Sequence, residues 1–310
     1  MILGEIMSIS VVMNGIISLF LIMFLGVYGS RKKIITKEVS KGLTNIMLKM
    51  TLPLMIISSF TFTFNDDMKM NVVKCFIYSL LVIVISIVIS YIILLPIKDK
   101  RKKMILQFSN VFSNCGYIGF PIINSIYGNE GVTYTSIFYM FFTIFLWTYG
   151  VILFSGNISK KDIKKVLLNP CVVAVYIGIL LMVFNIKLPQ DIISTMKTVG
   201  EMTSPLSMII VGTILSNVKI GKYLKDWTIY YEVIVRLIII PIIIYFIGYL
   251  IKDLGIVTNV MIVLCAMPAA AMTSILAENF EVEKEYASII VFITTFCSII
   301  TLPLMLKILI

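Results

Sequence analysis

The sequence contains no histidine and few charged residues. Only 14% of its 310 residues are Asp, Glu, Lys or Arg, whereas soluble domains carry about 25%. The absence of histidine removes the commonest metal ligand and the side chain best suited to titrate near neutral pH. The five cysteines are scattered singly, with no C-x-x-C spacing, so we interpret them as small buried apolar residues. We therefore expect no metal and no bound cofactor.

Sequence motifs of catalysis are also missing. No G-x-x-x-x-G-K-[ST] phosphate-binding loop occurs in the chain. An intramembrane enzyme would need an aspartate pair, a Ser–His pair or H-E-x-x-H, but there is no histidine and every aspartate falls in an expected loop. A signalling receptor would need room for a soluble output domain, and the longest polar connection is about a dozen residues. These absences disfavour both an enzyme and a receptor.

Long apolar runs are what the sequence does contain. Hydrophobic residues make up 59% of it, and the mean hydropathy is +1.04. A helix needs about 20 mainly apolar residues to cross a bilayer, and we expect an all-α integral membrane protein. Ten segments qualify: 8–28, 42–64, 72–96, 104–127, 132–156, 167–185, 198–217, 228–250, 257–277 and 286–308.

The net charge of +10 fits a membrane partner better than nucleic acid. Alternate loops hold 18 basic residues on one side of the expected bilayer and 6 on the other. Because lysine and arginine are retained at the anionic cytoplasmic leaflet, this bias places both termini outside. The prediction is a multi-pass protein of the plasma membrane.

Two pairs of landmarks suggest an internal duplication. The segments TLPLMII and TSPLSMII carry Pro53 and Pro205, which lie 152 residues apart. The interrupted fourth and ninth spans carry Pro121 and Pro268, which lie 147 residues apart. A nearly constant offset is what a duplicated unit would leave.

Five spans in each unit, an odd number, would insert the second unit upside down. We therefore predict two inverted five-helix repeats, residues 1–156 and 157–310. Inverted repeats with broken helices at corresponding positions are typical of secondary transporters.

The fourth span contains NCGYIGFP (114–121) and is expected to be interrupted at Gly116–Pro121, where Pro121 ends the broken segment; the ninth is expected to be interrupted at MPAAA (267–271). Lipid tolerates a broken helix only where the freed backbone faces protein or water. If the two breaks cross, the helix N-termini that follow them form a site for an anion, and the carbonyl ends that precede them could hold a cation. The alternative is a packing kink that lets helices approach closely.

Four stretches resemble the auxin efflux carrier family. They are NVFSNCGYIGFPIINSIYGNEG (110–131), PLSMIIVGTIL (205–215), RLIIIP (236–241) and AMPAA (266–270). The resemblance covers essentially the whole chain in order, without the long central loop of the plant carriers. The compact form is similar to bacterial permeases for malate or malonate.

The resemblance implies a fold and an activity. Spans 1, 2, 6 and 7 would form a scaffold, and spans 3–5 and 8–10 a mobile transport domain with elevator-like movement. The protein would be a homodimer that carries a small organic anion, such as malate, malonate or an auxin-like acid. No ATP is needed, and sodium or protons are the possible coupling ions.

The resemblance also implies which residues bind substrate at the crossing of spans 4 and 9. Asparagine amides would donate to a carboxylate, glycines would allow close approach, and hydroxyls would add further donors. For each polar residue the alternative is an ordinary interhelical hydrogen bond. The candidates are Asn110, Asn114, Gly116, Tyr117, Gly119, Pro121, Pro268, Ala269, Ala270, Thr273 and Ser274.

Charged residues inside expected spans are candidates for gating or coupling. Glu232 and Arg236 are four apart on one helix, so they can pair structurally or take part in coupling. Lys49 and Glu201 each precede a repeat proline, Pro53 or Pro205, by four residues. We predict that Lys49 attracts the anion and Glu201 takes part in gating or coupling; the alternative is that both reach to their interfaces.

Two alternatives remain for the kind of transporter and its substrate. A sodium- or proton-coupled carrier of the bile-acid-symporter type shares a similar crossed-helix plan, and dependence of uptake on a sodium gradient would distinguish it. An aromatic acid of the auxin type is a possible substrate, since Tyr117 and Phe120 could pack against a ring.

Overall fold

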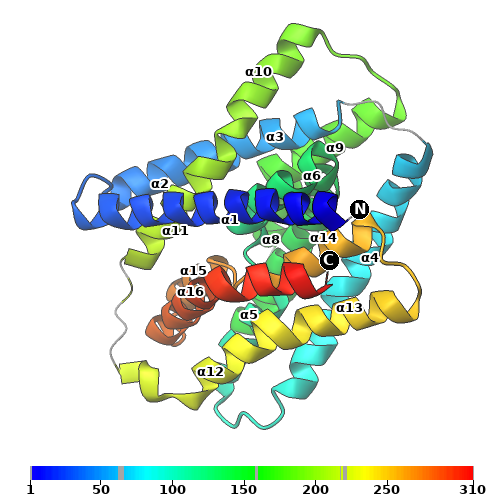
Figure 1. Cartoon of the computed structure of the whole chain (residues 1–310). Helices are drawn as coiled ribbons and strands as arrows, with labels where there is room; N and C mark the ends of the chain where they lie inside the picture. Colours follow the sequence, from blue (N-terminus) through cyan, green and yellow to red (C-terminus); the bar gives the residue numbers. More distant parts are fainter. Residues whose placement is uncertain (1, 62–65, 158–159, 217, 219–221, 310) are drawn as a thin grey trace. The chain divides into compact units, whose positions relative to one another are not determined.

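The computed structural model describes residues 2–61, 66–157, 160–216, 218 and 222–309. Every regular element within these residues is a helix (Figure 1). The one β-like feature among them is an isolated antiparallel bridge between Ser113 and Ala269. The predicted all-α class is confirmed.

Six helical stretches of the described chain are long and apolar enough to cross a membrane, and three apolar helices are shorter. Large apolar side chains also point outward, as they would toward lipid; examples are Leu25, Tyr91, Phe184 and Phe246. The protein is a multi-pass membrane protein, while the count of ten spans stays a prediction. The six stretches are Lys37–Ser59, Asp67–Ile93, Cys115–Ser155, Gln190–Ser216, Trp227–Leu250 and Lys284–Ile308; the shorter helices are Gly15–Arg31, Pro170–Val183 and Ile256–Ala266.

The chain divides into two compact units, each built from three segments. The first unit comprises Met1–Val73, Gly116–Met140 and Leu168–Asn217, and the second comprises Lys74–Cys115, Phe141–Leu167 and Val218–Ile310. The predicted scaffold and transport roles are not tested by this division.

Backbone contact at two glycines holds the longest helix pair of the first unit together. Helix α1 (Ile2–Arg31) packs along α11 (Thr203–Ser216). A Cβ atom built on Gly212 would lie 1.9 Å from the Met23 carbonyl oxygen, and one on Gly26 would lie 2.2 Å from that of Ile209. Small residues permit this approach, and the close backbones gain dispersion energy that lipid cannot replace.

The same unit contains a second set of packed helices. Helix α3 (Leu52–Ser59) lies against α9 (Pro170–Val183) and α10 (Gln190–Glu201). Gly200 brings α10 close to α3, because a Cβ atom there would lie 2.9 Å from the Met55 Cα atom. Helix α2 (Lys37–Ile46) leads into this cluster, and Thr36 caps its N-terminus through Val39 N–H.

Three π-helical turns each end two residues before a proline. They are η1 (Met47–Thr51) before Pro53, η2 (Cys115–Gly119) before Pro121 and η5 (Val235–Ile239) before Pro241. Proline offers no N–H and its ring crowds the preceding turn, so a wider turn relieves the clash. Pro121 therefore lies in the first turn of α6 (Phe120–Phe145), whereas we expected it to end the broken segment.

Helix α6 is itself interrupted at Gly128. This glycine has φ 56° and ψ −146°, a conformation that side-chain-bearing residues rarely adopt. The interruption falls between the expected fourth and fifth spans.

The second unit contains the remaining helices. Most of α4 (Asp66–Ile93) belongs to it, together with the end of α6. The other helices are α5 (Lys100–Val111), η3 (Leu146–Gly150), α7 (Val151–Ser155), α8 (Lys160–Leu167), η4 (Lys222–Lys225), α12 (Trp227–Ile234), η5, α13 (Ile240–Leu250), α14 (Ile256–Ala266), α15 (Met272–Asn279) and α16 (Lys284–Leu309).

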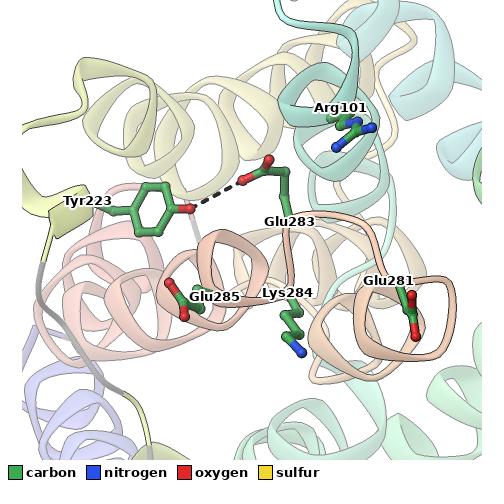
Figure 2. A pocket seen from close by; sticks show the side chains of 6 residues that line it. All are labelled: Arg101, Tyr223, Glu281, Glu283, Lys284 and Glu285. Carbon is green, nitrogen blue, oxygen red and sulfur yellow. Dashed lines mark hydrogen bonds between the residues drawn. The ribbon is translucent and has the colours of Figure 1, made fainter.

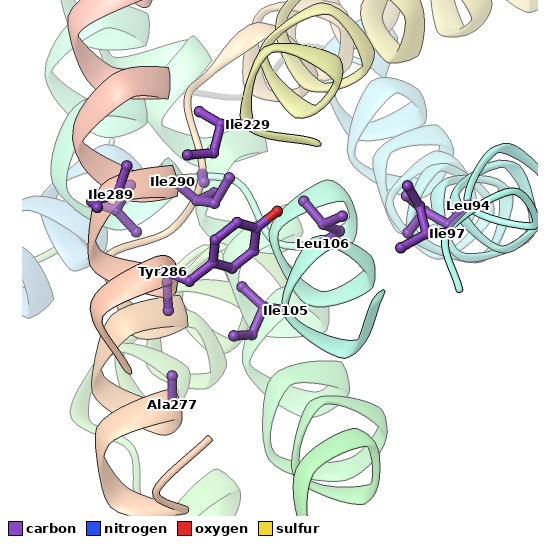
Figure 3. Packing of buried hydrophobic residues seen from close by; sticks show 12 residues of the cluster. Leu94, Ile97, Ile105, Leu106, Ile229, Ala277, Tyr286, Ile289 and Ile290 are labelled. Carbon is purple, nitrogen blue, oxygen red and sulfur yellow. The ribbon is translucent and has the colours of Figure 1, made fainter. Parts of the chain in front are cut away.

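Tyr286 lies at the centre of an apolar cluster in this unit (Figure 3). Its ring contacts side chains from α5, α12 and α16, including Ile105, Leu106 and Ile290. Its hydroxyl forms a 2.6 Å hydrogen bond with the Thr228 hydroxyl, so the buried polar tip is satisfied. The cluster packs both α5 and α12 against α16, which positions the end of α5 for the site described next.

Candidate substrate site

Two helices of the second unit stop inside the protein. Helix α5 ends at Val111, where Phe112 turns to an extended conformation with φ −102° and ψ 106°. Helix α14 ends at Ala266, where Met267 is extended with φ −66° and ψ 150°. The residues around both ends are buried, so their backbone groups need partners within the protein.

The two extended segments satisfy each other. Asn114 N–H donates to the Pro268 carbonyl at 2.8 Å, and Ala270 N–H donates to the Phe112 carbonyl at 2.9 Å. The predicted meeting of two interrupted helices is thus confirmed at this backbone crossing. The first interruption begins at Phe112, however, not at the predicted stretch from Gly116 to Pro121, because the extended residues that pair with Met267–Ala270 must precede η2.

Arg236 joins the ends of the two helices. Its Nη1–H donates to the Asn110 carbonyl at 2.6 Å, and its Nε–H donates to the Met267 carbonyl at 3.1 Å. These carbonyls lie at the C-terminal ends of α5 and α14, where the helix dipoles are negative. A fully buried guanidinium therefore lies where a positive charge is most stabilised.

Glu232 lies one turn before Arg236 and is also fully buried. Its Oε1 accepts a hydrogen bond from the Ser109 hydroxyl. The predicted ion pair between Glu232 and Arg236 is not among those of the described residues. Arg236 lies in the π-helical turn η5, and its guanidinium is engaged by the two carbonyls of the crossing.

A hydroxyl from α16 satisfies another freed backbone group. Ala269 N–H donates to the Thr294 Oγ1 at 3.2 Å, while Thr294 Oγ1 donates to the Ile290 carbonyl at 2.7 Å. Each unpaired backbone group in a dry interior would cost several kcal/mol. The freed backbone groups are thus hydrogen-bonded by the other extended segment, by Arg236 and by Thr294.

Several buried polar atoms near the crossing have no partner within the described chain. They are both side-chain atoms of Asn110, one carboxylate oxygen of Glu232, Nη2 of Arg236 and the Thr273 hydroxyl. All four side chains are 1% exposed or less. Buried polar atoms are normally hydrogen-bonded, so this group can accept a polar solute or water. Ser274 differs, because its hydroxyl donates to the Ala271 carbonyl.

The other predicted residues fall into both units. Asn114, Pro268, Ala269 and Ala270 are brought together with Asn110 and Thr273 in the second unit. The first unit contains the remaining substrate-binding candidates: Gly116, Tyr117, Gly119 and Pro121. Within that unit Gly116 faces Tyr139, whose ring would lie 3.1 Å from an added Cβ atom.

The first-unit candidates for gating do not all lie in one place. Glu201 lines a cavity of about 200 Å³ together with Lys197, Asn124, Asn129 and Ser58. Lys49 is exposed on η1 and is not among the residues that line this cavity. Pro53 is buried in α3, and Pro205 is exposed in the first turn of α11.

A second, larger cavity of about 430 Å³ lies in the second unit (Figure 2). Charged side chains from α5 and from the start of α16 line it, and Tyr223 donates to Glu283 at 3.2 Å. Nothing in the sequence pointed to this cavity. Its lining residues are Arg101, Tyr223, Glu281, Glu283, Lys284 and Glu285.

Two contributors to the crossing were missed from the sequence. Ser109 and Thr294 resemble ordinary helix hydroxyls, and no motif distinguishes Thr294 from its neighbour Thr295. Arg236 was identified only as a charged residue within a span. Its bridging role depends on the fold, which brings α5 and α14 to η5.

Comparisons with known proteins identify the family of the chain. Residues 11–306 match the model of a family described as membrane transport protein. An uncharacterized transporter of Methanocaldococcus jannaschii is 24% identical over 301 residues, which cover 94% of this chain and 97% of the relative. An uncharacterized transporter of Methanothermobacter thermautotrophicus is 28% identical over 211 residues, 66% of this chain and 68% of the relative. The chain therefore belongs to the membrane transport protein family, the auxin efflux carrier family that its motifs resemble.

Proposed function

We propose that the protein is a secondary active or facilitative transporter of a small organic anion, working by alternating access. The observation that carries the proposal is the crossing of α5 and α14, where buried donors lack partners. A carboxylate such as malate or malonate matches these donors. An auxin-like acid is the other candidate, and Tyr117 and Phe120 would then contact its ring.

The donors for such an anion come from three kinds of group. The Asn110 amide and the Thr273 hydroxyl have no partner in the described chain. The backbone after the crossing leads directly into α15, whose N-terminus has no side-chain cap. An uncapped helix N-terminus favours a negative charge through its free N–H groups and its dipole. The remaining candidates for substrate binding are Asn114, Gly116, Tyr117, Gly119, Pro121 and Ser274.

The proposal includes ten spans in two inverted repeats, with the fourth and ninth spans broken. Thr51 and Thr203 each lie two residues before a repeat proline, and Thr203 donates to Thr51 at 2.9 Å. Equivalent residues that touch are expected on a two-fold axis. The bridged pair of the crossing, Ser113 and Ala269, lies 156 residues apart, close to the 152 that separate the threonines. This pair is a further landmark of the proposed repeat, beside Pro121 and Pro268.

The remaining architecture follows from the family resemblance. We infer a scaffold of spans 1, 2, 6 and 7 and a mobile domain of spans 3–5 and 8–10 that moves like an elevator. The protein would act in the plasma membrane as a homodimer, with both termini outside. Solvent-accessible cysteine labelling of residues introduced at positions 37 and 191 of intact cells would test this orientation, since they should lie on opposite sides.

Lys49 and Glu201 are proposed to attract the anion and to take part in gating. Glu201 lines a cavity that also contains Lys197, so a charged solute could interact there with both signs. Uptake by Lys49→Ala and Glu201→Gln variants would test this role. Wild-type uptake and pH dependence in both would contradict it.

The decisive experiment is reconstitution into liposomes. A panel of labelled carboxylates is offered with sodium and proton gradients imposed separately. We expect saturable uptake of at least one small carboxylate, and an Asn110→Ala variant should lose most of it. Uptake of none would contradict the proposal. Dependence on sodium would instead favour the alternative, a carrier of the bile-acid-symporter type.

A further inference from the structure

The carbonyl ends of α5 and α14 form a place that would ordinarily attract a cation. The Asn110 and Met267 carbonyls lie at the negative ends of two helices and are buried from solvent. In transporters with discontinuous helices, such unwound carbonyl ends coordinate sodium or another exchangeable cation. In this protein they are engaged by a side chain of the chain itself.

Arg236 fits this position chemically. Its guanidinium is planar and presents N–H groups in a fixed fork, so one side chain can reach carbonyls on two different helices. Nη1 reaches the Asn110 carbonyl at 2.6 Å and Nε reaches that of Met267 at 3.1 Å. Lysine, with a single point charge on a flexible stem, would not present this fork.

The charge of this side chain is permanent. Arginine stays protonated in proteins, so the crossing keeps its positive charge through every stage of a transport cycle. An exchangeable cation would instead enter and leave with the solute. The other described side chain that is both buried and ionisable is Glu232, one helical turn before Arg236.

We propose that Arg236 is the resident cation of the crossing and closes its carbonyl site to sodium and other exchangeable ions. This inference rests on the proposed transport function and adds to it which ions can be coupled to transport. A site that is permanently filled leaves no room there for a coupling sodium ion. Coupling, where present, would then use protons or the substrate gradient alone.

The test uses the purified full chain in detergent and needs no substrate. Arg236→Ala should lower the apparent melting temperature by on the order of 10 °C, since two charge-assisted hydrogen bonds are lost. A few millimolar guanidinium chloride should restore most of that loss saturably, because the free ion fits the vacated place. Arg101→Ala, which removes an exposed guanidinium, is the matched control and should show no rescue.

Two results would overturn the proposal. One is an Arg236→Ala protein as stable as wild type, and the other is guanidinium that fails to stabilise this variant more than the control. A sodium titration of the wild type against choline at constant ionic strength keeps the test valid if Arg236→Ala does not fold. We expect no shift of the melting temperature, and a saturable rise with sodium would contradict the proposal.

A parallel liposome assay separates this inference from the proposed function. If no carboxylate is taken up, the transport proposal fails, whereas the thermal rescue still decides the inference about Arg236. If uptake occurs, it should be unchanged when sodium is replaced by choline. Uptake that requires sodium, together with sodium-dependent stabilisation, would assign the cation site to sodium instead.

Discussion

The two units of the protein differ in whether charged side chains and extended backbone take part in their buried hydrogen bonds. In the first unit the helices approach through glycines, and buried hydroxyls donate within their own helix, as Ser58 does, or to a neighbouring helix, as Thr203 does to Thr51. In the second unit, extended backbone and the Arg236 guanidinium also form buried hydrogen bonds that join different helices. The buried charged side chains of the described chain are both in the second unit.

This difference predicts that substitutions in the two units act through different physical effects. Close backbone packing at Gly26 and Gly212 leaves no room for polar solutes and resists sliding of the helices. Extended backbone with unpartnered donors is costly in a membrane, so we expect it to be retained for a role in the proposed transport. We therefore expect variants in the first unit to act through packing and variants in the second unit through charge and hydrogen bonding.

Among the variants that test this contrast, removal of the Glu232 carboxylate should cause the largest loss of stability. Glu232→Ala leaves the buried Ser109 hydroxyl without its carboxylate acceptor and removes the buried carboxylate nearest to Arg236 along the helix, which should cost about 3 kcal/mol of stability. Thermal unfolding in detergent, followed by tryptophan fluorescence, would measure the loss. The matched control is Glu201→Ala, an exposed carboxylate of the first unit that should change stability little. Equal melting temperatures for the two variants would contradict the contrast.

Overpacking should be the next largest effect, and it concerns the first unit. Gly212→Ala places a methyl group 1.9 Å from the Met23 carbonyl oxygen, so α1 and α11 must separate. We expect a loss of about 1–3 kcal/mol. Gly42→Ala is the control, because a Cβ atom there meets nothing within 4 Å and alanine favours the helix. If Gly212→Ala is as stable as Gly42→Ala, the helices do not pack through their backbones.

The sequence predicted the class of the protein and the existence of the crossing. Hydropathy predicted a helical membrane protein, and the glycine- and proline-containing stretches NCGYIGFP and MPAAA predicted that two helices are interrupted and meet. Both signals are local, because a bilayer demands long apolar runs and any exception stands out.

The details of the crossing could not be derived from the sequence. The first break was assigned to Gly116–Pro121, since glycine and proline are the usual helix breakers. The observed break at Phe112–Asn114 is imposed by pairing with Met267–Ala270, which is a tertiary effect. The partners of Arg236 and Thr294 likewise depend on which helices lie beside them, and spacing along one helix carries no such information.

A hydroxyl of the second unit offers a finer test of cross-helix hydrogen bonding. Thr294→Val removes the acceptor of Ala269 N–H and should cost about 1–2 kcal/mol, because a buried donor loses its partner. Thr295→Val is the matched control, since the Thr295 hydroxyl donates to the Val291 carbonyl of its own helix at 2.7 Å. Melting temperatures of both variants in detergent would be compared. Equal losses would mean that the Ala269 contact contributes nothing specific.

The smallest effect should come from a charge at the surface of the second unit, which separates ordinary surface electrostatics from the buried network. Asp226 caps α12 and forms a 2.6 Å ion pair with Lys102. Burial raises the pKa of this carboxyl, but hydrogen bonds from Lys102 and Thr228 outweigh it and hold the pKa below its ordinary value. Asp226→Asn keeps the cap and removes the charge, so it should cost only about 0.5 kcal/mol at neutral pH.

The pH dependence of this contribution has a definite sign. Because the folded-state pKa of Asp226 lies below the unfolded value of about 3.9, its stabilisation is complete above that value and is lost as the pH falls through the folded pKa. The difference in stability between wild type and Asp226→Asn should therefore shrink in acid. A double-mutant cycle with Lys102→Met isolates the pair. A coupling as large as the effect of Glu232→Ala would show that surface and buried charges of this unit are not distinct after all.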